Sequence, residues 1–211
     1  MPWMMEHRHL SKNLIFLTLE FRCLRQGKPM PELTALSELI PNLSANFPYE
    51  SEVSQIYALF ERDFIQDGVL VDSVPLRVFT HPSNFPLLRG KSETFVHIVT
   101  RENKLGYREF DVQRANRVHW IKPILLHVND SRIFVFDKSH DKTGKPQRYF
   151  WYKDKAFVVI LRHTHGTHYL LTAFCVDAQK ERQFLRWFNK GQCNKKPHIM
   201  CGARNLGIAT E

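Results

Sequence analysis

The sequence predicts an α+β fold, with a helical amino-terminal segment followed by a domain that combines helices with a four-stranded antiparallel sheet. Two observations carry this prediction. Residues 50–67 repeat their apolar side chains at helical spacing, and four short runs after residue 130 alternate as strands do. We therefore divide the chain into a helical segment and linker over residues 1–68, an α+β domain over 69–190, and a tail over 191–211 that is expected to be flexible.

The composition is that of a globular protein with a strong positive charge. The 211 residues are 43% hydrophobic and 24% charged, close to the average of folded domains. Lysine and arginine number 30 against 21 acidic residues, which gives a net charge of +9. This balance favours polyanionic partners, namely nucleic acids, phosphate groups or an anionic membrane surface.

Neither a membrane span nor a secretory signal is expected. The most apolar run, residues 14–19, is far shorter than the roughly 20 residues that cross a bilayer, and no small-residue cleavage site follows it before Arg22. The four cysteines lack C-x-x-C spacing, and Cys193, His198 and Cys201 have no fourth zinc ligand nearby. We expect a cytoplasmic protein with reduced thiols, no bound metal and no cofactor.

The amino-terminal segment is expected to contain a linker and one amphipathic helix. Glycine and proline punctuate residues 26–48, which leaves room for a short helix around 32–40. Residues 50–67 then form a helix that Ser51 caps and that ends at Asp67-Gly68. The change in sequence character near Gly68 indicates that residues 70–190 fold without the first 65.

Three elements are expected between residue 69 and the sheet. Residues 76–79 and 95–99 read as strands, and the second would place His97 and Val99 on one face. A polar loop over 101–108 follows. A helix over residues 112–128 then has Asp111 as its cap and a kink or break at Pro123, which lacks a backbone donor.

The carboxy-terminal half predicts the antiparallel sheet. Its strands are residues 133–136, 148–152, 156–161 and 169–176, with hairpin connections over 153–155 and 163–167. Alternation in the last strand puts Leu171 and Ala173 on one face and Leu170, Thr172 and Phe174 on the other. A helix over 177–190, with one apolar and one basic side, closes the domain.

Four residues are candidates for catalysis, and each has a structural alternative. His97 is either a half-buried histidine with one hydrogen bond or a general acid or base, because imidazole exchanges a proton near neutral pH. Arg114 and Arg117 lie three apart on one helix face and can bind a phosphodiester, although many basic helix faces are simply solvated. Thr172 is either a packing residue or a hydroxyl that holds a phosphate oxygen.

A second group of residues is expected to bind RNA. In the run over 148–153, aromatic rings alternate with cations, so that rings can stack on bases while cations meet phosphates; core strands use the same residue types. The expected RNA-binding residues are Arg101, Lys104, His119, Lys122, Arg148, Tyr149, Trp151 and Lys153.

Absent motifs narrow the chemistry. The sequence has no Walker A motif, no glycine-rich dinucleotide turn, no H-E-x-x-H and no G-x-S-x-G. Its acidic residues form no obvious pair for two-metal phosphoryl transfer. A nuclease on this chain would therefore act through histidine, arginine, lysine and hydroxyl groups.

The order of these elements resembles a family of nucleases. The resemblance rests on Phe95-Val96-His97-Ile98, on the stretch from Arg114 to Leu125, and on Tyr169 to Phe174, within residues 95–188. These pieces resemble the barnase–EndoU–colicin–RelE (BECR) superfamily of metal-independent RNases, nearest to its members in phages and polymorphic toxins. One departure is that no second histidine matches the usual acid–base partner.

The resemblance implies an endoribonuclease that belongs to a toxin or to a phage or mobile element. The ribose 2′-hydroxyl would attack the adjacent phosphorus and leave a 2′,3′-cyclic phosphate. The resemblance further implies that His97 is the acid or base, that Arg114 and Arg117 stabilise the charged phosphorane, and that Thr172 binds a non-bridging oxygen. Arg101 or Lys104 would add a cationic contact, and an antitoxin or immunity protein is an expected partner.

Two other classes of function fit the same sequence. A non-catalytic RNA- or DNA-binding module would share the charge and the aromatic residues but leave the nucleic acid intact. An accessory protein would instead use the amphipathic helix over 50–67 to dock another protein.

Overall fold

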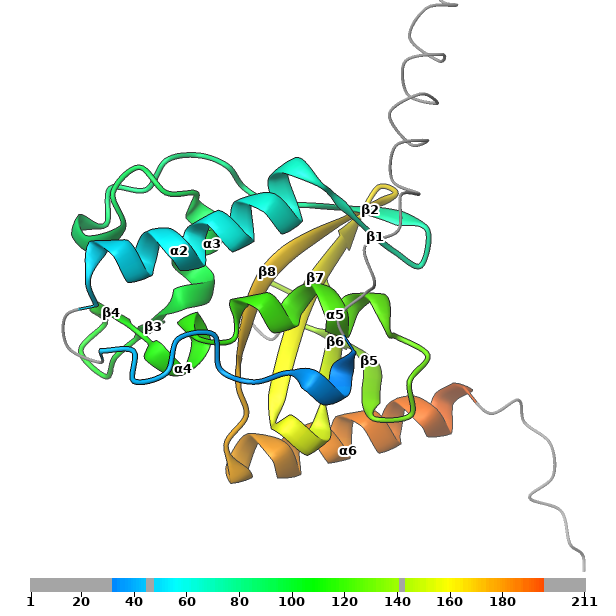
Figure 1. The fold of residues 1–211 in the computed structure, drawn as a ribbon. Coiled ribbons are helices and arrows are strands. Elements are labelled where there is room, and N and C mark those ends of the chain that lie inside the picture. Colours follow the sequence, from blue (N-terminus) through cyan, green and yellow to red (C-terminus); the bar gives the residue numbers. More distant parts are fainter. Residues whose placement is uncertain (1–31, 45–47, 141–142, 196–211) are drawn as a thin grey trace, which may run out of the picture.

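The computed structural model describes residues 32–44, 48–140 and 143–195, and Figure 1 shows how their elements are arranged. The helices are α2 (Glu50–Glu61), α3 (Glu93–Val99), α4 (Val112–Ala115), α5 (Ile121–Leu126) and α6 (Ala178–Lys195). The strands are β1 (Val69–Val71), β2 (Val74–Arg77), β3 (Thr100–Glu102), β4 (Arg108–Phe110), β5 (Ile133–Ser139), β6 (Pro146–Tyr152), β7 (Phe157–Thr164) and β8 (Thr167–Cys175). Short helical turns are η2 (Leu33–Ala35), η3 (Arg62–Gln66), η4 (Pro86–Leu88), η5 (Val118–Trp120) and η6 (Lys153–Lys155).

The protein has an α+β fold built on a mixed sheet. Six strands follow the order β1-β2-β8-β7-β6-β5, and β3 and β4 form a separate hairpin. The four strands expected after residue 130 pair antiparallel in sequence order. The sheet is larger than expected because the hairpin β1–β2 adds to it, with β2 parallel to β8. Strand β2, at residues 74–77, lies two residues earlier than the expected strand.

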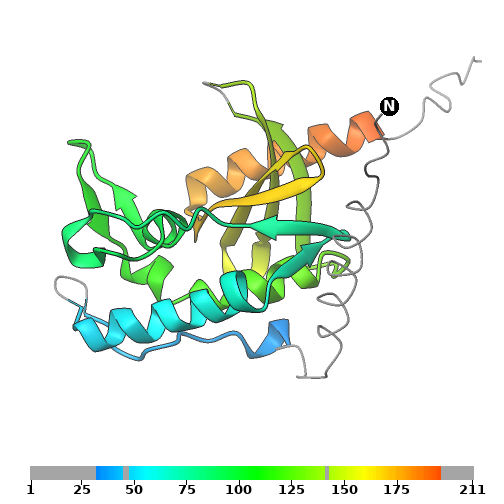
Figure 2. The ribbon, with the colours of Figure 1, turned by 90° about the horizontal axis from the view of Figure 1, so that it is seen from above.

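The sheet separates two apolar layers. In Figure 2, helix α6 lies on one side of the sheet, and α2 and α5 lie on the other. The larger cluster contains Phe150, Val159 and Leu170 of the sheet together with side chains from α2, α3 and α5. On the opposite face, Trp151 and Val158 pack against Phe184 of α6. None of the helices in the described ranges has both the length and the apolar character needed to cross a membrane.

The core extends across residue 68. Leu33 and Leu36, within the expected linker, are 2% and 6% exposed and join the same cluster as the sheet. Helix α2 contributes Val53, Ile56 and Phe60, so its apolar face is used inside the protein rather than for docking a partner. Residue 68 therefore does not bound the buried core. The short helix expected around 32–40 is only the turn η2, and residues 1–31 of the proposed amino-terminal segment lie outside the described residues.

The segment that carries His97 is a helix, not a strand. Ser92 caps it by accepting a hydrogen bond from the amide of Phe95 (3.3 Å), and Glu93 follows in the first turn. Phe95, Val96 and the other apolar residues of α3 are buried, and His97 alone among residues 94–99 is exposed. A short apolar run occurs both in buried helices and in strands. The apolar composition of this run therefore did not reveal that the segment is helical.

The next expected helix is interrupted before its proline. Asn116 caps the carboxy terminus of α4, Arg117 then leaves the helical conformation, and η5 and α5 follow. Pro123 lies in the first turn of α5, where its missing N–H costs no internal hydrogen bond. The polar loop expected over 101–108 is instead part of the β3–β4 hairpin, in which residues 101, 102 and 108 belong to the strands and 103–107 form the turn.

A β-bulge changes the expected faces of β8. Ile160 of β7 pairs with Thr172, whereas the next residue, Leu161, pairs with Leu170. Leu171 is therefore an extra residue, and the alternation shifts by one position beyond it. Leu170 and Ala173 consequently share the larger core, and Leu171 and Phe174 pack on the α6 side.

The remaining connections agree with the sequence. In the β7–β8 hairpin the two turn residues His165 and Gly166 have φ of 46° and 73°, as a type I′ turn requires. Helix α6 runs to Lys195, beyond the expected end at residue 190. The rest of the proposed tail, residues 196–211, lies outside the described residues, as do His198 and Cys201.

Candidate functional site

A polar hollow lies where β8 meets α3, α4 and the β3–β4 hairpin. Its volume is about 300 Å³. We call it the arginine pocket, and its lining residues are His97, Thr100, Arg101, Glu102, Arg108, Arg114, Arg162, Leu171 and Thr172. Four guanidinium groups thus surround a space that has a single carboxylate in its lining. Such a concentration of like charge suits an anionic ligand.

The polar side chains of the pocket come from two helices, the β3–β4 hairpin and the main sheet. The exposed side of α3 presents His97, and the two strands of the hairpin present Arg101 and Arg108. Arg114 ends α4, and the bulge in β8 brings both Leu171 and Thr172 to the lining. Bulges often redirect a side chain beside a site, and here the bulge lies next to Thr172 in the lining of the pocket.

Thr100 fixes two of the arginines. Its fully buried hydroxyl donates to the carbonyl of Val96 (2.6 Å) and accepts a hydrogen bond from Nη1 of Arg108 (2.9 Å). Its carbonyl accepts a hydrogen bond from Nη1 of Arg114 (2.9 Å). Asp111 holds the other side of Arg114 through a 3.3 Å ion pair with Nε. The arginines are therefore ordered by the protein before a ligand arrives, which lowers the cost of binding an anion.

The environment of His97 favours its neutral form. Partial burial lowers the pKa of His97, and the positive charges of Arg108 and Arg114 lower it further, while Glu93 opposes them. The imidazole is therefore free to accept a proton at neutral pH. Burial also lowers the pKa of Arg114, and Arg101 and Arg108 add to this effect. A guanidinium remains charged despite such a shift, so the pocket keeps its positive charge.

Of the expected site residues, four line the arginine pocket. They are His97, Arg101, Arg114 and Thr172. The expected loop residue Lys104 lies at the tip of the hairpin, outside the lining.

Arg117 is not part of the site, in contrast to its expected catalytic role. Because the chain leaves the helix at Asn116, Arg117 does not follow Arg114 on one face. Its Nη2 instead pairs with Glu38 (3.0 Å), its Nη1 with Gln113 (2.6 Å), and its guanidinium lies 5.1 Å from the Trp120 ring. Arg117 therefore ties the 32–44 segment to the rest of the fold.

His119 and Lys122 also have structural surroundings. The ring of His119 lies beside Trp120, and burial lowers the pKa of His119 while a hydrogen bond with the Ser37 backbone raises it. Lys122 pairs with Asp67 (2.9 Å) and Asp63 (3.4 Å) at the end of α2. Both side chains are therefore placed for packing rather than for contact with RNA at the pocket.

The aromatic–basic run of β6 is occupied within the fold. Trp151 is fully buried and Tyr149 is 8% exposed, because α6 covers this face of the sheet. Arg148 pairs with Asp72 (3.1 Å), and the Lys153 ammonium lies 5.6 Å from the Phe134 ring. The buried rings of Tyr149 and Trp151 have no free face on which a base can stack.

Five lining residues were not among the expected site residues, namely Thr100, Glu102, Arg108, Arg162 and Leu171. Arg108 was assigned to a polar loop, Arg162 lay between an expected strand and the following hairpin loop, and Thr100 followed an expected strand. Positive charge alone does not distinguish Arg108 and Arg162 from other surface arginines. Only the hairpin, the bulge and the packing of α3 on β8 bring them together.

No group of three or more histidine, cysteine or acidic side chains that could hold a metal ion occurs in the described part of the chain. Comparisons with known proteins add no further constraint. No family model matches the chain, and the searches of curated proteins and of solved structures gave no significant match.

Proposed function

We propose that this protein is an endoribonuclease that acts without a metal ion and uses the ribose 2′-hydroxyl as its nucleophile. The observation that carries the proposal is the arginine pocket. It combines one imidazole held in its neutral form with four guanidinium groups and a hydroxyl. Guanidinium groups can supply the charge stabilisation that metal ions provide in other nucleases.

His97 is the base in this mechanism. The phosphate of the scissile bond lies among the arginines, with the 2′-hydroxyl on the side of the imidazole. His97 takes the proton of the 2′-hydroxyl, and that oxygen forms a bond to phosphorus. The bond from phosphorus to the 5′-oxygen of the next nucleotide then breaks, which leaves a 2′,3′-cyclic phosphate. The leaving oxygen takes a proton from water, and the resulting hydroxide is neutralised by protonated His97.

Arg114 and Arg108 stabilise the transition state. Negative charge grows on the non-bridging oxygens as the phosphorane forms, and a fixed donor aimed at that charge typically contributes a factor of about 10²–10³ in rate. Thr100 and Asp111 hold these guanidiniums in place. Thr172 donates one neutral hydrogen bond to a non-bridging oxygen, which contributes less than a charged donor.

The test is single-turnover cleavage of RNA in the presence of EDTA, with analysis of the product ends. We expect wild-type protein to give 2′,3′-cyclic phosphate ends, and His97→Ala to react at least about 10²-fold more slowly because the general base is lost. Arg114→Gln should lower the rate by about 10²–10³-fold. His81→Ala and Arg182→Gln are matched controls, because both residues are exposed and lie outside the pocket.

A non-catalytic nucleic-acid-binding module is the second candidate, since it would use the same charged pocket. It predicts RNA binding that weakens with salt and no cleavage by the wild type. Full activity of folded His97→Ala would remove His97 as the base, whereas intact RNA after incubation with the wild type would favour the binding module. From the resemblance to toxin nucleases, we further propose an effector role with a neutralising partner protein.

A further inference from the structure

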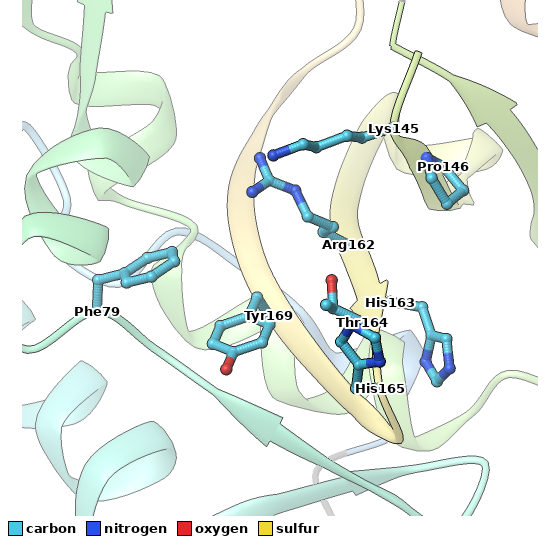
Figure 3. Close-up of a pocket in the computed structure, with 8 residues that line it drawn as sticks. All are labelled: Phe79, Lys145, Pro146, Arg162, His163, Thr164, His165 and Tyr169. Atoms are coloured by element: carbon cyan, nitrogen blue, oxygen red, sulfur yellow. The ribbon is translucent and has the colours of Figure 1, made fainter. Parts of the chain in front are cut away.

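A second and larger hollow adjoins the arginine pocket. Its volume is about 540 Å³, and its lining includes Phe79, Lys145, Arg162 and Tyr169. We call it the aromatic pocket, and Figure 3 shows its lining side chains. Arg162 lines both pockets, and a small hollow of about 140 Å³ between them is lined by Phe79, Arg162 and His97. A chain-like ligand in the arginine pocket can therefore continue into the aromatic pocket.

Two rings of the aromatic pocket form a stacking platform. The rings of Phe79 and Tyr169 are stacked, with centroids 5.4 Å apart and an angle of 18° between their planes. Phe79 is 38% exposed, so part of its side chain is open to solvent and to a ligand in the pocket. A nucleobase can extend this stack, since every base has a flat π face that packs on an aromatic ring.

The pocket also presents two cations. Figure 3 shows the charged ends of Lys145 and Arg162 beside one another, and both residues line the pocket. No hydrogen bond or ion pair joins the Arg162 side chain to any residue that the structure describes, and its Nε is buried without a partner. Two converging cations repel each other unless an anion lies between them. A phosphodiester group fits this position, because a guanidinium can bind it through two donors.

We propose that the aromatic pocket binds the nucleotide next to the scissile phosphate and thereby selects single-stranded RNA. The base stacks on the Phe79–Tyr169 pair, and Lys145 and Arg162 bind the backbone phosphate. In a duplex both faces of a base are occupied by its neighbours, so only an unpaired base is free to stack on the platform. This inference rests on the proposed function, since the cleavage site in the arginine pocket defines which nucleotide is adjacent.

Fluorescence anisotropy with an uncleavable probe tests the inference separately from catalysis. The probe is a short labelled 2′-O-methyl RNA, used as a single strand and as a duplex with its complement. We expect Phe79→Leu and Tyr169→Leu to bind the single strand about 5- to 100-fold more weakly than the wild type. Lys145→Gln should reduce the slope of log K against log salt by about 0.7, because one phosphate contact is lost.

Tyr107→Leu is the matched control, because Tyr107 is 69% exposed and lies outside the lining of both pockets. Lys145 is exposed, so the salt slope of Lys145→Gln tests the pocket even if a ring variant is destabilised. Preferential binding of the single strand that the ring variants lose would support the inference. Equal binding of single strand and duplex, or unchanged binding by both ring variants, would overturn it. If the wild type cleaves RNA and the ring variants bind the probe as well as the wild type does, only the proposed subsite is refuted. If the wild type binds the probe tightly but cleaves no RNA, the proposed nuclease activity is refuted.

Discussion

At the residue scale, the chemistry of the arginine pocket depends on the charges around one imidazole. Arg108 and Arg114 lower the pKa of His97, and Glu93, at the start of the same helix, raises it. Burial acts in the same direction as the arginines. His97 therefore stays neutral to a lower pH than an ordinary histidine, whose pKa is about 6.5.

This arrangement predicts opposite shifts in the pH dependence of cleavage. Protonated His97 cannot accept the 2′-proton, so kcat/KM should fall at acid pH with an apparent pKa below about 6.5. Arg108→Gln removes a positive charge, raises the pKa of His97 and moves this acid limb to higher pH. Glu93→Gln removes a negative charge and moves the limb to lower pH. Profiles measured in EDTA check this prediction, and shifts of the two variants in the same direction would contradict it.

At the element scale, the turn between α4 and α5 connects the site to the amino-terminal segment. Asn116, 2% exposed, accepts a hydrogen bond from the amide of Ile40 (2.6 Å) and donates one to the carbonyl of Ile40 (2.9 Å). The backbone carbonyl of Asn116 also accepts from Leu39 (3.1 Å). This interruption of the helix is thus a docking point for residues 32–44, and the neighbouring ion pair of Arg117 with Glu38 reinforces it.

We predict that Asn116→Ala lowers the free energy of unfolding by about 2–4 kcal/mol, because two partly buried backbone groups lose their partners. Urea denaturation measures this change. Asn129→Ala is the control, since Asn129 is exposed, and it should change the free energy of unfolding by less than about 0.5 kcal/mol. Equal stability of the two variants would show that the Ile40 hydrogen bonds do not anchor the segment.

The elements differ in how far their sequence predicts them. Strands β5 to β8 and helix α6 were predicted because alternation and helical periodicity extend over most of their length. Helix α3 was missed because Phe95 to Val99 are apolar on all sides but one, and such a run has no distinct period. The sequence signal for this helix was Ser92, whose side chain caps its amino terminus. The bulge at Leu171 leaves no local trace, since it depends on how β8 pairs with β7.

The same limit applies to the candidate site. His97 and Thr172 were identified from their residue types, their places in expected strands and the resemblance, and the structure brings both to one pocket. Arg117 was chosen because it follows Arg114 by three residues, a spacing that matters only if the helix continues. Tyr149 and Trp151 were chosen for an alternation that core strands share. Phe79 and Tyr169 become a platform only through the parallel pairing of β2 with β8, which sequence spacing does not reveal.

At the scale of the whole molecule, the described residues share one main core. Phe95 of α3 lies against Tyr57 and Phe60 of α2, with ring centroids 4.9 and 5.4 Å apart. Leu33 packs in the same cluster, and the Tyr152 hydroxyl donates to its carbonyl (3.3 Å). The helix that carries His97 is therefore supported by residues from before position 68.

It follows that a chain shortened to residues 69–211 should lose its cooperative unfolding transition. Removal of α2 exposes Phe95 and the side of η5 that packs on α2, and each large side chain left without its contacts costs about 3–5 kcal/mol. The shortened chain and the full chain are compared by thermal unfolding, which is monitored by near-ultraviolet circular dichroism. A sharp transition in the shortened chain would instead support the domain boundary that the sequence suggested near Gly68.

The central claim is that a ribose 2′-hydroxyl attacks phosphorus in the arginine pocket without a metal ion. The most direct measurement uses a single-stranded DNA oligonucleotide that contains one ribonucleotide, incubated with the wild type in EDTA. We predict cleavage only on the 3′ side of that ribonucleotide, with a 2′,3′-cyclic phosphate on the upstream product and none of this product from His97→Ala. Cleavage at deoxyribonucleotides, or the same product from folded His97→Ala, would contradict the account.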